Sequence, residues 1–457
     1  MRKHFDFYAY CSPTSGKYYI DGNEYFYGED FRTRKRYREY AAAGFNMLLL
    51  QHENSYGGED FASSACNLCM TEAYKAGIKR IIVSDTRIKQ LCVTENLVGE
   101  GGKFPDEDSL CDALKGYIAP YSAKAGFYGL QLADEPEWQY LKSHGTVVRC
   151  LKKIRPDIYL QCNLLDIVEA KRLSPEISDE FAAYEDYLLR FLSETGSDSI
   201  CFDEYPFRKN YILGGYSLPA YQIVGKVCRE RGLEFRTVLQ SFSWLNHGGL
   251  VHRRVTEKDM YWQINLAMGF GCKEYSFFTY FTKPQVVLKG GIHTDGVDGA
   301  AFINRDGTRT RLYCYTRRII SEVKRFEKVL LPYRYRGSYL FFEKGKSAKD
   351  FMQTEYAFAE AKCDKIEVSP DRGVVLVTEL KSDDSLMFMI ENIGNIKDEI
   401  DTGRKTVIKA DLNKLGGKIK FYFRGRLVKR KIVKGILTET LSCGDALFLT
   451  VKDTRQK

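Results

Sequence analysis

Apolar runs and amphipathic stretches alternate along residues 1–335. Eight short apolar runs have the length and residue types of β-strands. They are Phe5–Cys11, Gly44–Gln51, Gly77–Ser84, Gly126–Ala133, Asp157–Leu164, Ser197–Phe202, Leu233–Gln240 and Gly271–Phe281. Each is followed by a stretch with helical periodicity, and the predicted helices are Glu29–Ala43, Asp60–Ala76, Asp106–Ala123, Pro136–Ile154, Asp179–Glu194, Leu218–Arg231, Thr256–Met268 and Arg311–Val329. Eight strand–helix units in succession predict an α/β fold, a (β/α)8 TIM barrel.

The pattern changes after the last of these helices. Short strand-like runs now follow one another without helices between them, and turns rich in Gly, Asp and Asn separate them. These runs are Gly373–Leu380, Ser385–Ile390, Lys418–Phe423, Lys429–Val433 and Ala446–Val451. We therefore expect two domains, a barrel over residues 1–335 and a small antiparallel β-sandwich over residues 336–457.

The formal net charge of +9 is confined to the end of the chain. Residues 401–457 hold 15 Lys and Arg against 5 Asp and Glu, so they alone carry a net +10. A solvated strand face is the first interpretation of this excess, and an anionic surface or polymer partner is the second. We expect no nucleic-acid partner and no membrane partner, and homo-oligomerisation stays open.

The cysteine content indicates a compartment. Thirteen Cys, an odd number, are scattered without the spacing of a disulfide framework, and several lie inside apolar runs. This usage is typical of reduced thiols in a cytosolic protein. The sequence also lacks an apolar run of the length that spans a membrane, so we expect a cytoplasmic protein.

Polar and aromatic residues collect where the predicted barrel strands end. In a (β/α)8 barrel these carboxyl ends converge on one mouth, where catalytic residues lie. Cleavage of a glycosidic bond requires two carboxyl groups, while aromatic rings stack on sugars and polar side chains bind the hydroxyl groups. The candidate catalytic residues are Glu135, Asp203 and Glu204. The candidate substrate-binding residues are Glu53, Asp85, Arg87, Asn163, Tyr205, Gln240, Trp244, His247 and Tyr280. For the pair Asp85 and Arg87, a structural ion pair is the alternative.

Four of these strand ends carry a recognisable pattern. The segments GLQLADEP, ICFDEYPF, TVLQSFSW and EYSFFTYFTKP occur in this order. Together they resemble a barrel glycoside hydrolase of the clan A type, and the chain is similar to family 42 β-galactosidase-like and family 5-like sequences that carry a β-sandwich after the barrel. The resemblance implies a glycosidase that acts on an oligosaccharide or small glycoside, with Glu135 as general acid/base.

The resemblance also exposes a departure. The nucleophile of the clan is a glutamate at the end of the seventh strand, and this chain has Gln240 there. The second carboxylate is then expected from Asp203 or Glu204, and because side chains alternate along a strand only one of them faces the mouth. We favour Asp203. A loop acid, Glu53 or Asp85, is a second explanation, and sugar binding without cleavage is a third. By the same alternation, Asp134 is expected to point to the face opposite Glu135.

Two other classes of protein are weighed against the glycosidase. The first is a carbohydrate-binding barrel without turnover, which Gln240 favours. The second is a metal-dependent lyase or isomerase of the enolase type, with oxygen ligands from Asp85, Asp134, Asp166 and Asp203. A strand-end Lys base is missing for the second class, and no GxGxxG or P-loop motif follows a strand. We therefore expect neither a metal nor a cofactor.

Overall fold

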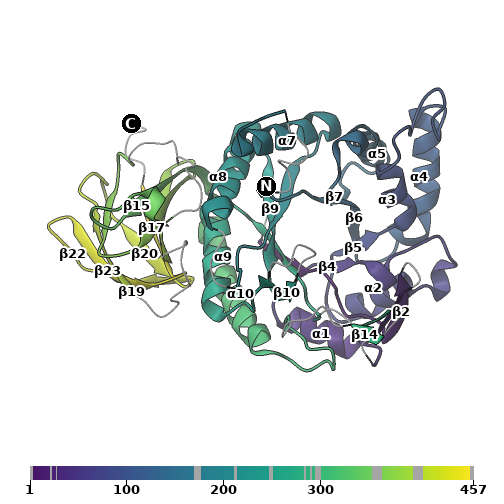
Figure 1. Cartoon of the computed structure of the whole chain (residues 1–457), viewed down its shortest axis with the longest axis horizontal. Helices are drawn as coiled ribbons and strands as arrows, with labels where there is room; N and C mark the ends of the chain where they lie inside the picture. The colour runs from purple at the N-terminus through teal and green to yellow at the C-terminus, as the bar shows by residue number, and fades with distance from the viewer. Residues whose placement is uncertain are drawn as a thin grey trace.

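A computed structural model of the chain describes eleven segments. They are residues 4–20, 23–26, 28–168, 176–209, 214–245, 251–282, 285–288, 291–293, 300–351, 363–394 and 405–452. The chain up to α10, which ends at Leu330, forms a ring of strands and helices, and the chain from Arg334 onward forms a stack of β-sheets beside it (Figure 1).

The ring is built on two four-stranded parallel sheets. The strands of the first, in order, are β4 (Leu48–Leu50), β5 (Ile81–Ser84), β6 (Phe127–Asp134) and β7 (Tyr159–Asn163), and those of the second are β1 (Asp6–Ala9), β12 (Glu274–Phe278), β9 (Glu234–Gln240) and β8 (Ser199–Glu204). Backbone hydrogen bonds join the sheets at both seams. Leu164 N–H donates to the Cys201 carbonyl (2.8 Å), and Asn46 N–H donates to the Phe7 carbonyl (3.0 Å). The arrangement is TIM-barrel-like, and each observed strand overlaps a predicted one.

Helices cover the outside of this ring (Figure 1). They are α1 (Arg34–Ala42), α2 (Ala65–Lys75), α3 (Thr86–Cys92), α4 (Glu107–Ser122), α5 (Leu141–Ile154), α7 (Glu180–Thr195), α8 (Gly214–Arg231), α9 (Glu257–Gly269) and α10 (Arg311–Leu330), with single 3-10 turns at His52–Asn54, Phe61–Ser63 and Trp138–Tyr140. Several begin at the Asp, Ser or Thr caps that their sequences predict, as at Asp106 and Thr256. None of the described helices combines the length and the hydropathy needed to cross a membrane.

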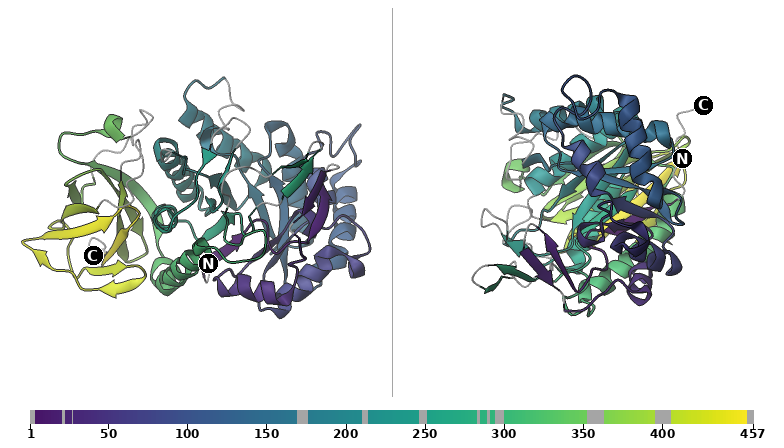
Figure 2. Two further views of the ribbon diagram at one scale, coloured as in Figure 1. Left: turned by 60° about the horizontal axis from the view of Figure 1, so that its bottom comes forward. Right: turned by 90° about the vertical axis from the view of Figure 1, so that its right-hand side faces the viewer.

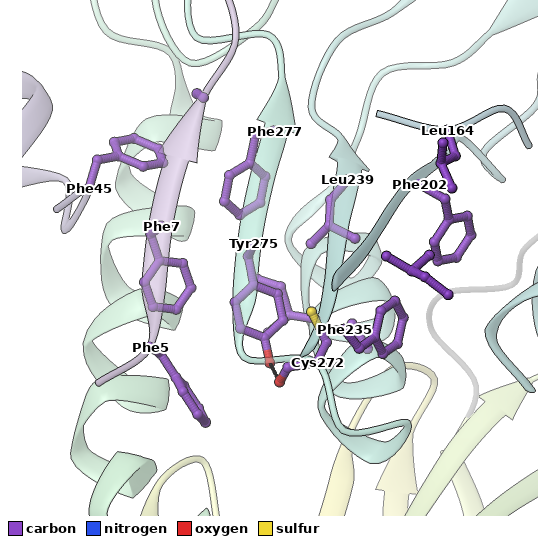
Figure 3. Packing of buried hydrophobic residues seen from close by; sticks show 14 of the residues in the cluster. Phe5, Phe7, Phe45, Leu164, Phe202, Phe235, Leu239, Cys272, Tyr275 and Phe277 are labelled. Carbon is purple, nitrogen blue, oxygen red and sulfur yellow. Dashed lines mark hydrogen bonds between the residues drawn. The ribbon is translucent and has the colours of Figure 1, made fainter. Parts of the chain in front are cut away.

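Side chains alternate between the two faces of the parallel strands. On β1 and β12, Phe7 and Tyr275 face the helices and stack on each other with centroids 5.1 Å apart (Figure 3). Their neighbours on the opposite face fill the interior of the ring, as Tyr8 and Val238 do. Both faces of the strands are thus buried, which is why the sequence shows continuous apolar runs instead of alternating ones.

Small hairpins were not predicted. One four-stranded sheet combines β2 (Lys17–Ile20) and β3 (Asn23–Phe26) with β13 (Gln285–Leu288) and β14 (Gly291–His293), and a second hairpin pairs β10 (Trp244–Leu245) with β11 (Val251–His252). Each strand has only two to four residues. Runs this short display no periodicity, so pairing between distant segments decides their structure.

The sheets formed by the chain from Arg334 onward are antiparallel. A six-stranded sheet holds, in order, β15 (Arg334–Phe342), β17 (Val374–Lys381), β18 (Ser385–Gly394), β24 (Ala446–Lys452), β20 (Lys420–Phe423) and β21 (Arg426–Val428). A four-stranded sheet holds β16 (Glu367–Pro370), β19 (Lys405–Asp411), β23 (Ile436–Ser442) and β22 (Ile432–Val433), and a short helix, α11 (Ala348–Phe351), lies between β15 and β16 in the chain.

The six-stranded sheet has two buried faces. Phe388 and Leu449 belong to the cluster shared with the four-stranded sheet, whereas Met389 and Phe448 pack into the core of the helical ring. The side chain of Asn265 on α9 donates to the Gly444 carbonyl across this junction (2.8 Å). The antiparallel part therefore packs directly on the helices beside it.

Candidate active site

The end of β6 is irregular, and this irregularity places Asp134. The register between β6 and β7 shifts between Gln131 and Ala133, after which Asp134 pairs with Asn163. The extra residue of such a bulge turns the following side chains to the other face. Asp134 therefore shares a face with Asn163 and interacts with its side chain. The expectation that Asp134 points to the opposite face is wrong, because strict alternation assumes an unbroken ladder.

Glu135 follows in a strained backbone conformation. Its φ of 53° lies in the left-handed region, which non-glycine residues rarely adopt and which recurs at functional sites. Its N–H donates to the Asn163 carbonyl (2.8 Å), so β7 fixes the position of the turn. The Glu135 side chain is exposed to solvent, and its charge raises the pKa of Asp203. Asp134 and Glu135 at this strand end are thus both near enough to Asp203 on β8 for their charges to raise its pKa.

Asp203 on β8 is the buried member of the group, with only 5% of its surface exposed. Its Oδ2 accepts hydrogen bonds from Asn163 Nδ2 (2.9 Å) and from the Tyr205 hydroxyl (3.1 Å). Burial raises the pKa of Asp203 well above its usual value, and the charges of Glu135 and Asp166 raise it further. The ionised form of Asp203 is therefore disfavoured at this site.

Glu204, the next residue, faces the opposite way. The Ser217 hydroxyl on α8 donates to Glu204 Oε1 (2.8 Å), so this carboxyl group lies between the sheet and the helices. Burial, with the charge of Asp166, raises the pKa of Glu204 to about 8. Of the two adjacent acids, only Asp203 lies on the face that carries Asn163.

An aromatic cluster lies beside Asp203. The Tyr205 ring meets Trp244 edge to face (centroids 5.2 Å apart) and lies 5.6 Å from the Phe278 ring. Trp244 stacks on His252 at 3.7 Å within the β10–β11 hairpin, and both rings contact Tyr205 at the end of β8. Burial, together with the contact to the Arg208 guanidinium, lowers the pKa of His252 to about 3, so this imidazole is neutral.

Lys89 supplies a positive charge near the carboxyl groups. The surrounding protein partly desolvates Asp134 and raises its pKa, although solvent still reaches the side chain. Lys89 on α3 and the hydrogen bond with Asn163 act in the opposite direction. Tyr10, just after β1, feels the charge of Asp134 and its ring lies 6.2 Å from that of Phe278. The site therefore has a mixed charge and aromatic walls.

Several of these residues were not singled out from the sequence. They are Tyr10, Lys89, Arg208, His252 and Phe278. Asp134 and Asp166 were considered from the sequence only as ligands of the enolase-type alternative, and their charges act on Asp203. Tyr10 and Phe278 were detectable in principle, because they lie at the ends of the first and eighth strands. Lys89 and His252 had no such signal, since one lies on an unpredicted helix and the other on an unpredicted hairpin.

Three of the predicted residues have structural partners away from Asp203. Asp85 is fully buried, pairs with Arg87 (2.7 Å), accepts from the Tyr121 hydroxyl (2.9 Å) and caps α3. This is the structural ion pair that the sequence left as the alternative. Glu53 accepts hydrogen bonds from Thr14 Oγ1 and the Ser15 N–H, and burial raises its pKa to about 7. Glu53 thus stabilises the loop after β1 and does not contact the carboxyl group of Asp203 on β8 through any of these hydrogen bonds.

Gln240 and Tyr280 are also placed elsewhere. Gln240 is fully buried: its Oε1 accepts from the Phe207 N–H (3.0 Å), and its Nε2 lies within donating distance of the Phe242 and Arg253 carbonyls. These contacts brace the loops that follow β8 and β9 and occupy the amide group. The Tyr280 ring packs against Tyr40 in the outer core. His247 lies outside the described residues.

Among the described residues, no three His, Cys, Asp or Glu side chains are grouped in the manner of metal ligands. Of the acids proposed for the enolase-type alternative, Asp85 is engaged by Arg87 and Tyr121, and Asp203 is engaged by Asn163 and Tyr205.

Comparisons with known proteins identify the fold. No protein-family model and no curated protein sequence matches the chain. Among solved structures, the α-amylase of Geobacillus thermoleovorans in complex with acarbose is 11% identical, with a TM-score of 0.53 over 98% of both chains. An Anoxybacillus α-amylase is 11% identical with a TM-score of 0.53 (99% and 98% covered), and a family 5 glycoside hydrolase from Bacteroides vulgatus is 10% identical with a TM-score of 0.50 (99% and 90% covered). The chain therefore has a fold that glycoside hydrolases also have.

Proposed function

We propose that the protein is a glycosidase that cleaves a glycosidic bond in an oligosaccharide or small glycoside. The observation that carries the proposal is that Glu135, after β6, and Asp203, at the end of β8, share Asn163 as a partner and interact electrostatically. Asn163 on the intervening strand bonds both, through its carbonyl to the Glu135 N–H and through its side chain to Asp203. Two carboxyl groups on neighbouring elements are what hydrolysis of an acetal requires.

The electrostatics of this pair suit an acid working with a base. Burial and the charge of Glu135 raise the pKa of Asp203, so the pair holds one proton at a pH where isolated carboxyl groups have lost theirs. This proton belongs to the pair and not to one residue alone. One carboxyl group is then available to protonate the leaving oxygen, and the other acts as nucleophile or base. The resemblance to clan A sequences implies the acid/base role for Glu135. We assign the second role to Asp203, because the position of the clan's nucleophile holds Gln240 in this chain.

The surroundings offer contacts for a sugar. Tyr205, Trp244 and Phe278 form an aromatic wall next to Asp203, and aromatic faces stack on the apolar faces of sugar rings. Asp134 lies on the same side and is open to solvent, where its oxygens can accept hydrogen bonds from hydroxyl groups. We assign Tyr205, Trp244 and Asp134 to substrate binding, and Asn163 to positioning Asp203.

The similar structures support the proposed glycosidase at the level of the fold. They are α-amylases, one of them with bound acarbose, and a family 5 glycoside hydrolase, and they share the fold over nearly the whole chain. The resemblance of the four strand-end segments to clan A glycoside hydrolases implies the same chemistry. We place the activity in residues 1–335, and we place the protein in a reducing compartment because all thirteen Cys are free thiols.

Carbohydrate binding without turnover is the second candidate, and Gln240 favours it. The end of β9 contributes no carboxylate, and its amide braces two loops. The two candidates differ in whether Glu135 and Asp203 perform chemistry or only bind hydroxyl groups.

A panel of aryl glycosides and short oligosaccharides tests the proposal. We expect the wild-type protein to release product from at least one member, and Glu135→Gln to abolish release while calorimetry still detects binding of the same sugar. Glu137→Gln, which alters an exposed neighbour, serves as the matched control and keeps full activity. If the wild-type protein binds a sugar and cleaves none of the panel, the binding candidate replaces the glycosidase.

A further inference from the structure

One edge of the β-sandwich is basic and apolar at the same time. We define the basic edge as residues 424–434, which comprise β21, the connection 429–431 and β22 with its flanks. Within these eleven residues lie six Lys and Arg and no Asp or Glu. Because β21 is the last strand of the six-stranded sheet and β22 the last of the four-stranded sheet, this one segment borders both sheets. It belongs to the part of the molecule that projects away from the ring (Figure 2).

Most of the positive charge in the basic edge is not neutralised by the protein. Arg424 pairs with Asp445 and Arg430 pairs with Glu439. The other four cations have no ion-pair partner within the part of the chain that the structure describes, and all four are exposed. They are Arg426, Lys429, Lys431 and Lys434. An unneutralised cluster of this kind attracts an anionic partner.

Large aliphatic side chains are exposed between these cations. Leu427 is 65% exposed, Val433 53% and Ile432 38%. They are three of the six exposed large hydrophobic residues among the described parts of the chain, and they lie within seven consecutive residues. Lys on an edge strand is a common device against unwanted strand pairing, but that device does not require exposed aliphatic neighbours. The exposed aliphatic side chains therefore indicate a binding partner that buries them.

The charge and the apolar surface together select the partner. A second copy of this chain would place the same four cations against each other, which disfavours self-association through this edge. A soluble polyanion would satisfy the cations and leave the aliphatic side chains in water. An anionic lipid surface accommodates both, since headgroups attract Lys and Arg while aliphatic side chains enter the boundary with the acyl chains.

We propose that the basic edge docks the protein onto an anionic lipid surface. This departs from the expectation of no membrane partner, because the sequence showed the basic residues but not the exposure of Leu427, Ile432 and Val433. The contact is peripheral: β21 and β22 lie on the surface while the ring of helices and strands remains beside it. Glu135 and Asp203 take no part, so the docking is independent of the proposed hydrolysis.

Co-sedimentation of the full-length protein with vesicles tests the proposal. One set of vesicles contains equal parts of phosphatidylglycerol and phosphatidylcholine, and the other contains phosphatidylcholine alone. We expect binding to the first set only. Each Lys or Arg near an anionic surface contributes roughly fivefold to the partition constant, so Lys431→Gln with Lys434→Gln weakens binding by about 25-fold. Leu427→Ser with Val433→Ser weakens it roughly tenfold or more, because the apolar contact is lost.

A matched double variant controls for total charge. Lys103→Gln with Lys142→Gln removes two exposed cations near α4 and α5, on the side of the ring away from the sandwich, and leaves vesicle binding unchanged (Figure 1). Thermal unfolding of each variant verifies that it is folded. The proposal is overturned if the wild-type protein ignores both sets of vesicles. It is also overturned if the Lys431/Lys434 and Lys103/Lys142 variants lose vesicle binding equally. A third refuting result is that a soluble polyphosphate binds as tightly as the vesicles, while the Leu427/Val433 variant binds the polyphosphate and the vesicles as the wild type does.

Discussion

Replacing Glu204 by Gln separates the two adjacent acids of β8. Asp203 lies toward Asn163 in the candidate site, whereas Glu204 lies between the sheet and α8 and accepts from Ser217. Gln retains the shape of the side chain and an oxygen for the Ser217 hydroxyl, but it has no charge to lose or gain. We therefore expect Glu204→Gln to keep glycosidase activity and to change the pH dependence of stability.

The size of this change follows from the raised pKa. Burial moves the pKa of Glu204 from 4.5 to about 8 in the folded protein. The direction of the pH effect on stability follows from the unfolded state, in which Glu204 ionises near pH 4.5 while the native carboxyl group stays neutral. The contribution of Glu204 to the free energy of unfolding is thus fully present below about pH 4.5 and is lost as the pH rises toward about 8. At about 1.4 kcal/mol per pH unit, the wild-type protein loses roughly 4 kcal/mol between about pH 5 and about pH 8 that the variant keeps.

Urea unfolding of both proteins at the two pH values measures this difference. The variant should gain stability relative to the wild type by about 4 kcal/mol over the interval, which corresponds to about 4 °C in Tm for a chain of 457 residues unfolding as one unit. Glu95→Gln, at an exposed position, is the control and shows no such gain. A stability gap that stays constant with pH would refute the burial of a neutral Glu204. Loss of activity in Glu204→Gln would refute its orientation.

The remaining predictions concern the site itself. Asp203→Asn should lower kcat by on the order of a thousandfold without unfolding the protein, as kinetics and circular dichroism will show. Asn163→Ala removes a hydrogen bond that lowers the pKa of Asp203, so the limb of the pH–rate profile governed by Asp203 should move up by about one unit. Tyr205→Phe removes a second donor to the same oxygen, and its effect on that limb should have the same sign. Gln240→Glu should cost about 3–5 kcal/mol in urea unfolding and add no activity, because it buries a charge beside the Phe207 and Phe242 carbonyls.

The order of strands and helices was predictable because each element carries its own signal. Parallel strands buried on both faces are short apolar runs, as at Ile81–Ser84, and the helices between them begin at caps such as Asp106. Apolar runs and helix caps in the sequence were therefore sufficient to predict the ring of strands and to locate the strand ends where polar residues collect. Alternation along a strand predicted that only one of Asp203 and Glu204 faces the mouth, and β8 is regular. The preference for Asp203 came from the resemblance and not from alternation.

Features that depend on distant segments were not predictable. The bulge near Leu132 inserts one residue into β6 without any compositional mark, and it decides that Asp134 joins the site. Gln240 ends a strand like the other candidates, but carbonyl groups of the loop after β8 and of Arg253 capture its amide. Sequence position places a residue near the mouth of the ring, whereas the hydrogen bonds of neighbouring loops decide whether its side chain faces a substrate.

The most direct test of the central claim is azide rescue of alanine variants on an activated aryl glycoside that the wild-type protein cleaves. A small anion can replace a missing carboxylate only where that carboxylate takes part in the reaction. We expect Glu135→Ala and Asp203→Ala each to lose activity by on the order of a thousandfold, and azide to restore turnover in at least one of them with a glycosyl azide as product. Glu204→Gln should remain active without azide. Wild-type turnover in Asp203→Ala or in Glu135→Ala would contradict the two-carboxyl site.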